Sequence, residues 1–212
     1  MITPYYDDGQ ITIFHGDCRE ILPSLDKVDL VLTDPPYGIA DKWPGGGGHG
    51  WNKRSKTFCV NPDDALRNTW DSEPSDAETI ALILDSAKAA IIWGGNYFIL
   101  PPTRGWLVWN KPERNFSLAE AELAWTTRDN VIRVFDCHRS DIGRTHPTQK
   151  PVSLMKWCLE FFPNAETIID PFMGSGTTIR AAKDLGRRAI GIEQVEEYCE
   201  IAVKRLAQEV LF

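Results

Sequence analysis

The stretch Val28-Asp-Leu-Val-Leu-Thr-Asp-Pro-Pro-Tyr-Gly38 is the part of the sequence from which the fold can best be predicted. Its first six residues form a short apolar run with several β-branched side chains, which is typical of a strand buried on both faces of a parallel sheet. Asp34 follows at the carboxyl end of that strand, where ligands bind in α/β proteins. The two prolines after it fix φ and push the residues before them toward extended conformations, so we expect a stiff turn.

This turn carries three groups that suit a planar amine on a nucleobase. Asp34 and the carbonyl of Pro35 can accept the two protons of the amine, and Tyr37 can stack on the ring. Asp-Pro-Pro also begins ordinary loops, so the motif alone leaves a purely structural role open. A second motif is needed to decide between the two.

The second motif lies far along the chain, where residues 167–178 are Thr-Ile-Ile-Asp-Pro-Phe-Met-Gly-Ser-Gly-Thr-Thr. They predict a strand, a turn with two glycines, and a helix whose first N–H groups are free to meet a ligand. No lysine follows Gly176, which argues against a Walker phosphate loop. Glu193 ends the next predicted strand, 17 positions after Gly176, and an acid near this offset binds ribose hydroxyls in Rossmann-type folds. The combination indicates an adenosine-bearing cofactor; a glycine turn with a surface glutamate is the alternative.

Composition and length are those of a globular, soluble protein. The chain has 212 residues, of which 42% are hydrophobic and 25% charged, so we expect a single domain spanning residues 1–212. No apolar run approaches the roughly 18 residues of a membrane helix, and the amino terminus lacks the pattern of a signal peptide, which predicts a cytoplasmic protein with no membrane partner. Five scattered cysteines without a Cys-x-x-Cys pair favour free thiols and no metal site.

The charge distribution bears on nucleic-acid binding. A net charge of −7 argues mildly against such a partner, because phosphate binding normally leaves a basic footprint. Residues 42–62, however, contain no acid and four basic side chains: Lys42, Lys53, Arg54 and Lys56. The same segment contains four consecutive glycines, which cannot pack a core, so residues 38–75 predict a flexible loop inside the domain. This loop is a candidate lid that contacts DNA, with a plain linker as the alternative.

Hydrophobic periodicity predicts alternating strands and helices along the rest of the chain. We expect strands at 11–17, 90–95, 105–112 and 188–193, and helices at 18–25, 76–90 (capped by Ser75), 152–161 and 179–185. Residues 119–137 predict a β-hairpin. The order predicts an α/β protein with a mostly parallel sheet that ends in an antiparallel hairpin.

Together the two motifs resemble those of the DNA amino-methyltransferases, which use S-adenosylmethionine. Further blocks that match the family in order are Gly16-Asp17, Trp109-Asn-Lys111, His146-Pro-Thr-Gln-Lys-Pro151 and Gly191-Ile-Glu193. The catalytic motif precedes the cofactor motif, which resembles the circularly permuted order of the β class. The resemblance covers nearly the whole chain and implies a Rossmann-like methyltransferase fold with a seven-stranded sheet.

The resemblance also implies roles for individual residues. The catalytic set is Asp34, Pro35, Pro36 and Tyr37. The cofactor-binding set is Asp17, Thr148, Lys150, Asp170, Phe172, Gly174, Ser175, Gly176, Thr177 and Glu193. Within it, Asp17 would accept a hydrogen bond from the adenine amino group of the cofactor, Lys150 would face its methionine carboxylate, and Glu193 would hold its ribose.

The function implied is site-specific methylation of the exocyclic amino group of adenine in double-stranded DNA, by base flipping and direct in-line transfer. Asp34 favours adenine, because serine is usual at that position in cytosine-specific members. The alternatives are cytosine-N4 methylation, methylation of RNA, and a catalytically silent DNA-binding subunit; the missing Walker lysine disfavours a nucleotide hydrolase. The enzyme could serve a restriction-modification system, a phage or a housekeeping pathway.

Target recognition departs from the family pattern. Members usually carry a sizeable recognition region before the His-Pro-Thr-Gln-Lys-Pro block, and here only residues 137–144 stand in that place. Recognition would then use this short segment, the loop at residues 38–75, or a homodimer or other partner.

Overall fold

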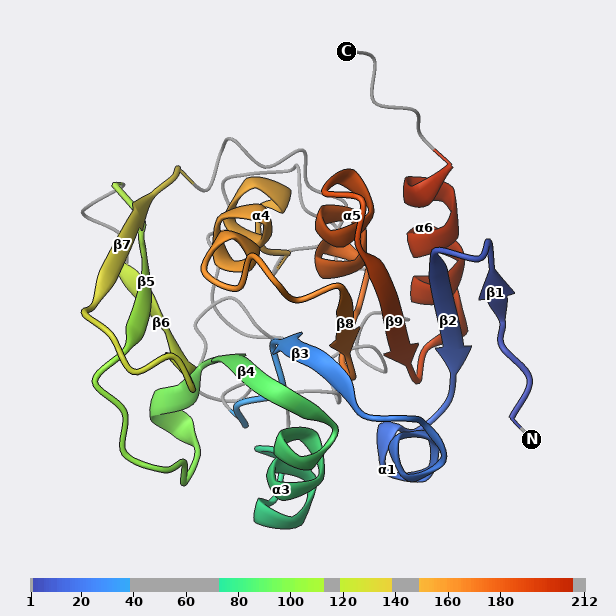
Figure 1. Ribbon diagram of the computed structural model, residues 1–212, viewed down its shortest axis with the longest axis horizontal. Helices are drawn as coiled ribbons and strands as arrows, with labels where there is room; N and C mark the ends of the chain where they lie inside the picture. Colours follow the sequence, from blue (N-terminus) through green and yellow to red (C-terminus); the bar gives the residue numbers. More distant parts are fainter. Residues whose placement is uncertain (1, 39–72, 113–118, 139–148, 208–212) are drawn as a thin grey trace, which may run out of the picture.

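The computed structural model describes residues 2–38, 73–112, 119–138 and 149–207. In this part of the chain, nine strands form one sheet in the order β1-β2-β9-β8-β3-β4-β6-β5-β7, with helices on both faces (Figure 1). The predicted α/β Rossmann-like class is confirmed, but the predicted count of seven strands was wrong. One strand that the sequence did not reveal is β1 (Tyr6–Asp7), which pairs antiparallel with β2 and is too short to show an alternating pattern.

The centre of the sheet consists of five parallel strands. They are β2 (Ile11–His15), β9 (Arg188–Glu193), β8 (Thr167–Asp170), β3 (Val28–Thr33) and β4 (Ala87–Trp93). Strands covered by helices on both faces need apolar side chains on both, which explains the nearly continuous hydrophobic run of β3.

Helices cover the sheet from both sides (Figure 1). One face carries α4 (Val152–Glu160), α5 (Thr177–Asp184) and α6 (Glu196–Leu206); the other carries α1 (Cys18–Ile21) and α3 (Ala77–Asp85). Two short 3-10 helices, η1 (Leu22–Ser24) and η4 (Gly95–Tyr97), follow α1 and β4. Each face has its own buried apolar cluster. No helix in the described ranges combines the length and apolar character needed to cross a membrane.

One predicted helix cap was wrong. The side chain of Asp76, and not that of Ser75, accepts a hydrogen bond from the backbone N–H of Thr79 at 2.7 Å. Asp is as good a capping residue as Ser, and the helix begins one residue later than the Ser75 cap implies. α6 was not predicted: the last element expected from the sequence was the strand at residues 188–193.

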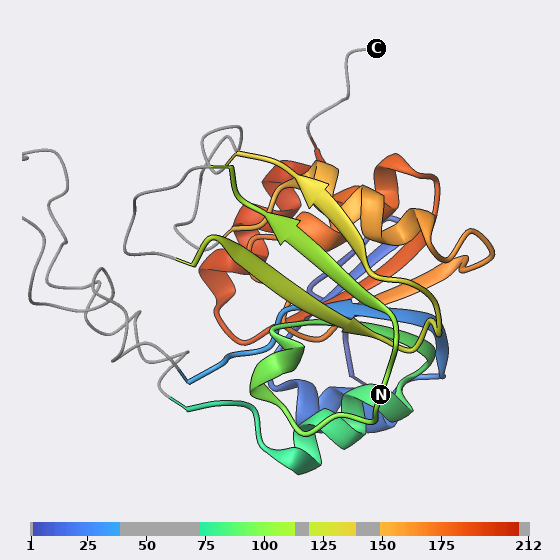
Figure 2. The ribbon, with the colours of Figure 1, turned by 90° about the vertical axis from the view of Figure 1, so that its left-hand side faces the viewer.

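The antiparallel end of the sheet differs from the hairpin predicted within residues 119–137. β6 (Ala121–Thr126) and β7 (Arg133–Asp136) do not pair with each other, because β5 (Trp106–Asn110) lies between them (Figure 2). β5 is antiparallel to β6 and parallel to β7. The chain crosses over the start of β5 at Gly105, where a Cβ atom would stand 1.9 Å from the carbonyl oxygen of Arg128. The hairpin therefore consists of β5 and β6.

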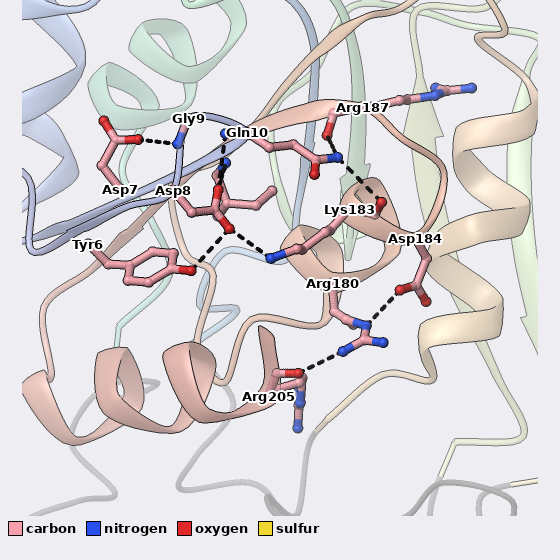
Figure 3. A network of polar contacts seen from close by, with 11 residues as sticks. Tyr6, Asp7, Asp8, Gly9, Gln10, Arg180, Lys183, Asp184, Arg187 and Arg205 are labelled. Atoms are coloured by element: carbon pink, nitrogen blue, oxygen red, sulfur yellow. Dashed lines mark hydrogen bonds and ion pairs between the residues drawn. The ribbon is translucent and has the colours of Figure 1, made fainter. Parts of the chain in front are cut away.

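Polar contacts tie the amino-terminal edge of the sheet to the helices (Figure 3). Asp8, in the turn between β1 and β2, pairs with Lys183 of α5 at 2.7 Å. Arg180 of the same helix pairs with Asp184 at 2.7 Å and donates to the backbone carbonyl of Arg205 in α6, also at 2.7 Å. These contacts hold α5 and α6, which flank the glycine-containing turn, in a fixed relation to the sheet.

β3 and β8 are neighbours in the sheet, and the helices that follow them lie on opposite faces. In α/β folds such a point opens a crevice at the carboxyl ends of the strands. The hydroxyl of Thr33 donates to Asp170 Oδ1 at 2.7 Å, and both residues are buried. This bond joins the strand end that carries the Asp34 turn to the strand end that carries the glycine turn.

Thr33→Val should destabilise the protein more at pH 8 than at pH 5. Burial raises the pKa of Asp170 to about 6, although hydrogen bonds from Thr178 and Thr33 lower it. Because this folded-state pKa exceeds the unfolded one, the contribution of Asp170 to stability declines as pH rises from about 4 to about 6. Without the hydrogen bond from Thr33, the ionised form of Asp170 is disfavoured further. The free energy of unfolding should therefore fall by about 1–3 kcal/mol at pH 8 and by less at pH 5.

Denaturant unfolding at the two pH values measures this difference. Thr12→Val on β2 is the matched control, because Thr12 is partly buried in the same sheet and its hydroxyl forms no hydrogen bond within the described residues. A loss of the same size at both pH values, or a larger loss at pH 5, would contradict the role given to Thr33.

Candidate active site

Asp34 lies directly after β3, with about a third of its side chain exposed. The hydroxyl of Tyr37 donates to Oδ1, and the ammonium of Lys150 pairs with Oδ2. The turn between Asp34 and Tyr37 is anchored from outside, since the carbonyl of Pro36 accepts a hydrogen bond from the N–H of Ser75 at 3.1 Å. The stiffness expected of the two prolines is thus supplemented by a contact with the segment before α3.

Lys150 is shared between two carboxylates. Its side chain is only 5% exposed, and its ammonium lies 3.3 Å from Glu122 Oε2 in addition to its contact with Asp34. Glu122 Oε1 in turn accepts a hydrogen bond from the ammonium of Lys111, whose side chain is also buried. Four alternating charges result, Asp34, Lys150, Glu122 and Lys111, and we call them the charge row.

The pKa shifts within the charge row follow from burial and pairing. Burial raises the pKa of Asp34, the charge of Glu122 adds to this, and Lys150 and Tyr37 oppose it. Burial alone would raise the pKa of Glu122, but Lys150 and Lys111 outweigh it and lower the pKa. Burial alone would lower the pKa of Lys150, but Asp34 and Glu122 outweigh it and raise the pKa. Within the charge row, Asp34 therefore has a raised pKa and Glu122 a lowered one.

Aromatic side chains form the wall beside Asp34. Tyr37 stacks on Tyr97 with ring centroids 4.8 Å apart, and it meets Phe98 edge-on at 6.1 Å. Behind it lies Gly94, where a Cβ atom would stand 2.0 Å from Tyr37 Cε1. Burial, together with the charge of Asp34, raises the pKa of Tyr37 well above its ordinary value. Tyr37 consequently keeps its proton and remains a hydrogen-bond donor to Asp34.

The turn after β8 forms the opposite wall. The N–H of Gly174 donates to Glu193 Oε2 at 3.0 Å, and the N–H of Val195 donates to Oε1 at 2.8 Å. Gly174 has φ +51°, and a Cβ atom there would meet nothing within 4 Å, so the backbone borders open space. Gly176, with φ +80°, begins α5 and packs against Ala202 of α6. The two glycines therefore have different uses: Gly174 leaves space for a ligand, and Gly176 lets α5 pack closely against α6.

One pocket brings both motifs together. The predicted site residues that line it are Asp34, Pro36, Lys150, Asp170, Phe172, Gly174, Ser175, Thr177 and Glu193. Pro35, Tyr37 and Gly176 belong to the same turns without lining the pocket. Thr148 lies outside the described residues, as do residues 39–72 of the predicted lid and residues 139–144 of the short recognition segment.

Asp17 lies at the amino terminus of α1, next to the pocket-lining residue Cys18. It caps α1 by accepting a hydrogen bond from the N–H of Arg19 at 2.8 Å, and it pairs with the guanidinium of Arg19 at 2.5 Å. Its neighbour Cys18 lines the pocket, but Asp17 does not. Its hydrogen bond with the adenine amino group of the cofactor stays a prediction.

Several residues of the site escaped sequence analysis. Glu122 lies on a predicted strand. A charged side chain is expected there anyway, because strands often alternate buried and solvent-exposed residues. Tyr97 follows the predicted strand at residues 90–95, and nothing in its spacing indicates that it meets Tyr37. Trp93 is fully buried, and its Nε1 has no hydrogen-bond partner within the described structure. These residues come from β4, η4 and β6, outside both motifs.

Comparison with known proteins places this arrangement in a family. A family model described as DNA methylase matches residues 108–204. The Type II methyltransferase M2.DpnII of Streptococcus pneumoniae is 52% identical over 264 residues, which cover 99% of this chain and 94% of that protein. The chain belongs to the N6/N4 DNA methylase family.

Two further similarities support this membership. The putative methylase YubD of Escherichia coli (strain K12) is 50% identical over 217 residues, covering 91% of the chain and 88% of YubD. The crystal structure of the M1.HpyAVI–SAM complex matches with a TM-score of 0.59 and 26% identity, covering 92% of the chain and all of that structure. Membership confirms the predicted resemblance and, at the level of the family, S-adenosylmethionine as cofactor and DNA amino groups as substrate.

Gly94→Ala should disable this methylase through Tyr37. The new Cβ atom would overlap the Tyr37 ring and displace it from Asp34, and a misplacement of about 1 Å in an active site can cost about 100-fold in rate. Radiolabelled methyl transfer to unmodified DNA measures the effect.

Gly186→Ala is the matched control. Gly186 has φ +71°, close to the +67° of Gly94, but a Cβ atom there meets nothing within 4 Å. Both variants should lose about 1–2 kcal/mol of stability from backbone strain, and only Gly94→Ala should lose activity. Equal activity in the two would refute the positioning of Tyr37 by Gly94.

Proposed function

We propose that this protein methylates the N6 amino group of adenine in double-stranded DNA, with S-adenosylmethionine as donor. The supporting observation is that Asp34 and Glu193, from motifs at opposite ends of the chain, line one pocket. The first motif suits a nucleobase amine, and the second suits the adenosine of the methyl donor. Because both motifs line one pocket, the methyl group can pass from the donor to the amine.

The residues of the pocket fit the cofactor. Gly174 leaves open space beside its backbone, and Glu193 presents a carboxylate held by two backbone N–H groups. Phe172, Val195 and Tyr198 add apolar and aromatic wall. When bound, S-adenosylmethionine supplies an electrophilic methyl group on a sulfonium centre.

The catalytic turn provides two acceptors for the target amine, Asp34 and the carbonyl of Pro35. The carbonyl of Pro36 is already used by Ser75 at 3.1 Å, whereas no hydrogen bond to the Pro35 carbonyl forms within the described residues. Hydrogen bonds from both amine protons favour a tetrahedral nitrogen with a localised lone pair. Asp34 then stabilises the positive charge that develops on the nitrogen, and alignment of the two substrates lowers the barrier further.

Tyr37 and Tyr97 would receive the extruded base. Flipping a base out of duplex DNA costs about a few kcal/mol, and stacking on an aromatic side chain returns roughly 1–3 kcal/mol. Tyr97 is half exposed while Tyr37 is backed by Gly94, so the pair forms a wall with a rigid inner ring and an accessible outer ring.

The remaining parts of the proposal concern the whole chain. Residues 1–212 would form one domain, and the loop at residues 38–75 would contact DNA. The relative M2.DpnII is a Type II methyltransferase, which favours a role in a restriction-modification system. A homodimer and a cytoplasmic location stay predictions.

Asp34→Ala should lower methyl transfer by at least about 100-fold, the loss typical of removing a group that stabilises transition-state charge. Calorimetry should find cofactor binding nearly unchanged, because the glycine turn and Glu193 are intact. Asp26→Ala is the control, since Asp26 is exposed just before β3 while Asp34 lies just after the same strand. Retained transfer by Asp34→Ala would refute the catalytic role.

A nucleoside digest of DNA methylated by the wild-type protein identifies the base. We expect N6-methyladenine, because Asp34 is the residue usual for adenine in the family. N4-methylcytosine alone would contradict the adenine assignment while leaving the family chemistry intact.

A further inference from the structure

Lys150 poses an electrostatic problem for the proposed reaction. A carboxylate stabilises a developing positive charge on the target amine only to the extent that its own charge is not already compensated. The ammonium of Lys150 pairs directly with Asp34 Oδ2 and also lies 3.3 Å from the hydroxyl of Tyr37. A lysine paired with Asp34 alone would neutralise the group that the reaction needs.

Glu122 relieves this compensation. Its Oε2 lies 3.3 Å from the same ammonium, so the three protons of Lys150 face three oxygens, on Asp34, Tyr37 and Glu122. We infer that Glu122 is a positioning residue for Asp34: by sharing Lys150, it leaves the charge of the catalytic carboxylate less compensated and therefore available to the target amine. This inference rests on the function proposed above.

Glu122 is itself rigidly placed. It lies on β6 opposite Trp109 of β5, and the backbone N–H of Lys111 donates to the carbonyl of Glu120 at 2.9 Å. The ammonium of Lys111 pairs with Glu122 Oε1 and lies 4.5 Å from the centre of the Trp109 ring. Paired strands thus fix both Glu122 and the cation that keeps it ionised. The antiparallel strands β5 and β6 contribute to the site through this contact.

The charge row makes the inference measurable through pH. The charged and titratable groups that interact with Lys150 or Glu122 are Asp34, Tyr37, Lys111 and Cys158. Tyr97 interacts with Tyr37, and Asp170 interacts with Asp34. Among them, Asp34 has its pKa raised by the charge of Glu122 and lowered by Lys150. Removing the charge of Glu122 should therefore lower the pKa of Asp34.

Glu122→Gln keeps the shape of the side chain and removes its charge. The acid limb of the kcat profile should move to lower pH, and kcat should fall by about tenfold or more, as when a residue that orients a reacting group is lost. The KM for S-adenosylmethionine should not change, because Glu122 does not line the pocket. Glu166→Gln is the control, since Glu166 is exposed and its side chain has no partner within the described residues.

A second measurement needs neither DNA nor activity. Carboxyl ¹³C titration by NMR of the unliganded protein should find that, as pH falls, Asp34 protonates before Glu122, and that Asp34 titrates at lower pH in Glu122→Gln. If Glu122→Gln does not fold, the order in which Asp34 and Glu122 protonate in the wild-type protein tests the inference by itself.

The outcomes separate this inference from the proposed function. A wild-type protein that transfers no methyl group to DNA overturns the proposed function, and the titration still tests the charge row. An active wild-type protein whose pH profile and Asp34 titration do not move in Glu122→Gln overturns only the positioning role. Protonation of Glu122 before Asp34 also overturns it.

Discussion

The hydrogen bond between Thr33 and Asp170 is the contact on which the rest of the site depends. It joins two buried side chains 137 positions apart in the sequence, at the ends of adjacent parallel strands. Parallel strands deliver their carboxyl ends to one edge of a sheet, and the helices after β3 and β8 depart to opposite faces. The turn with Asp34 and the turn with Gly174 are thereby forced to share one pocket, although they belong to separate motifs.

The charge row adds a second constraint. Two lysines and two carboxylates are brought together in a mostly buried site, where an unpaired charge would be costly. Their pairing requires β6 to place Glu122 within reach of Lys150, and Lys111, just after β5, to lie beside Glu122. The antiparallel extension is therefore linked to the chemistry of the parallel core, and substitutions in it should influence a reaction that takes place at the end of β3.

Local patterns predicted what short-range physics controls. The β-branched run of β3, the glycines of the turn after β8 and the acid at the end of β9 are each explained by their immediate neighbours, and these elements were found. Strand partners were harder to predict. β7 pairs with β5 because the chain near Arg128 passes close to Gly105, and the alternation of apolar and polar residues along a strand does not reveal such a contact. Glu122 and Tyr97 act through neighbours that are distant in sequence, which no local pattern reveals.

The central claim is that one pocket holds a methyl donor with its reactive end toward Asp34. A crystal structure with sinefungin, a stable analogue whose amine replaces the transferable methyl group, tests it most directly. The account predicts sinefungin in the pocket that Gly174, Glu193 and Asp34 line, with that amine directed at the carboxylate of Asp34. Sinefungin bound elsewhere, or bound there with its amine turned away from Asp34, would contradict it.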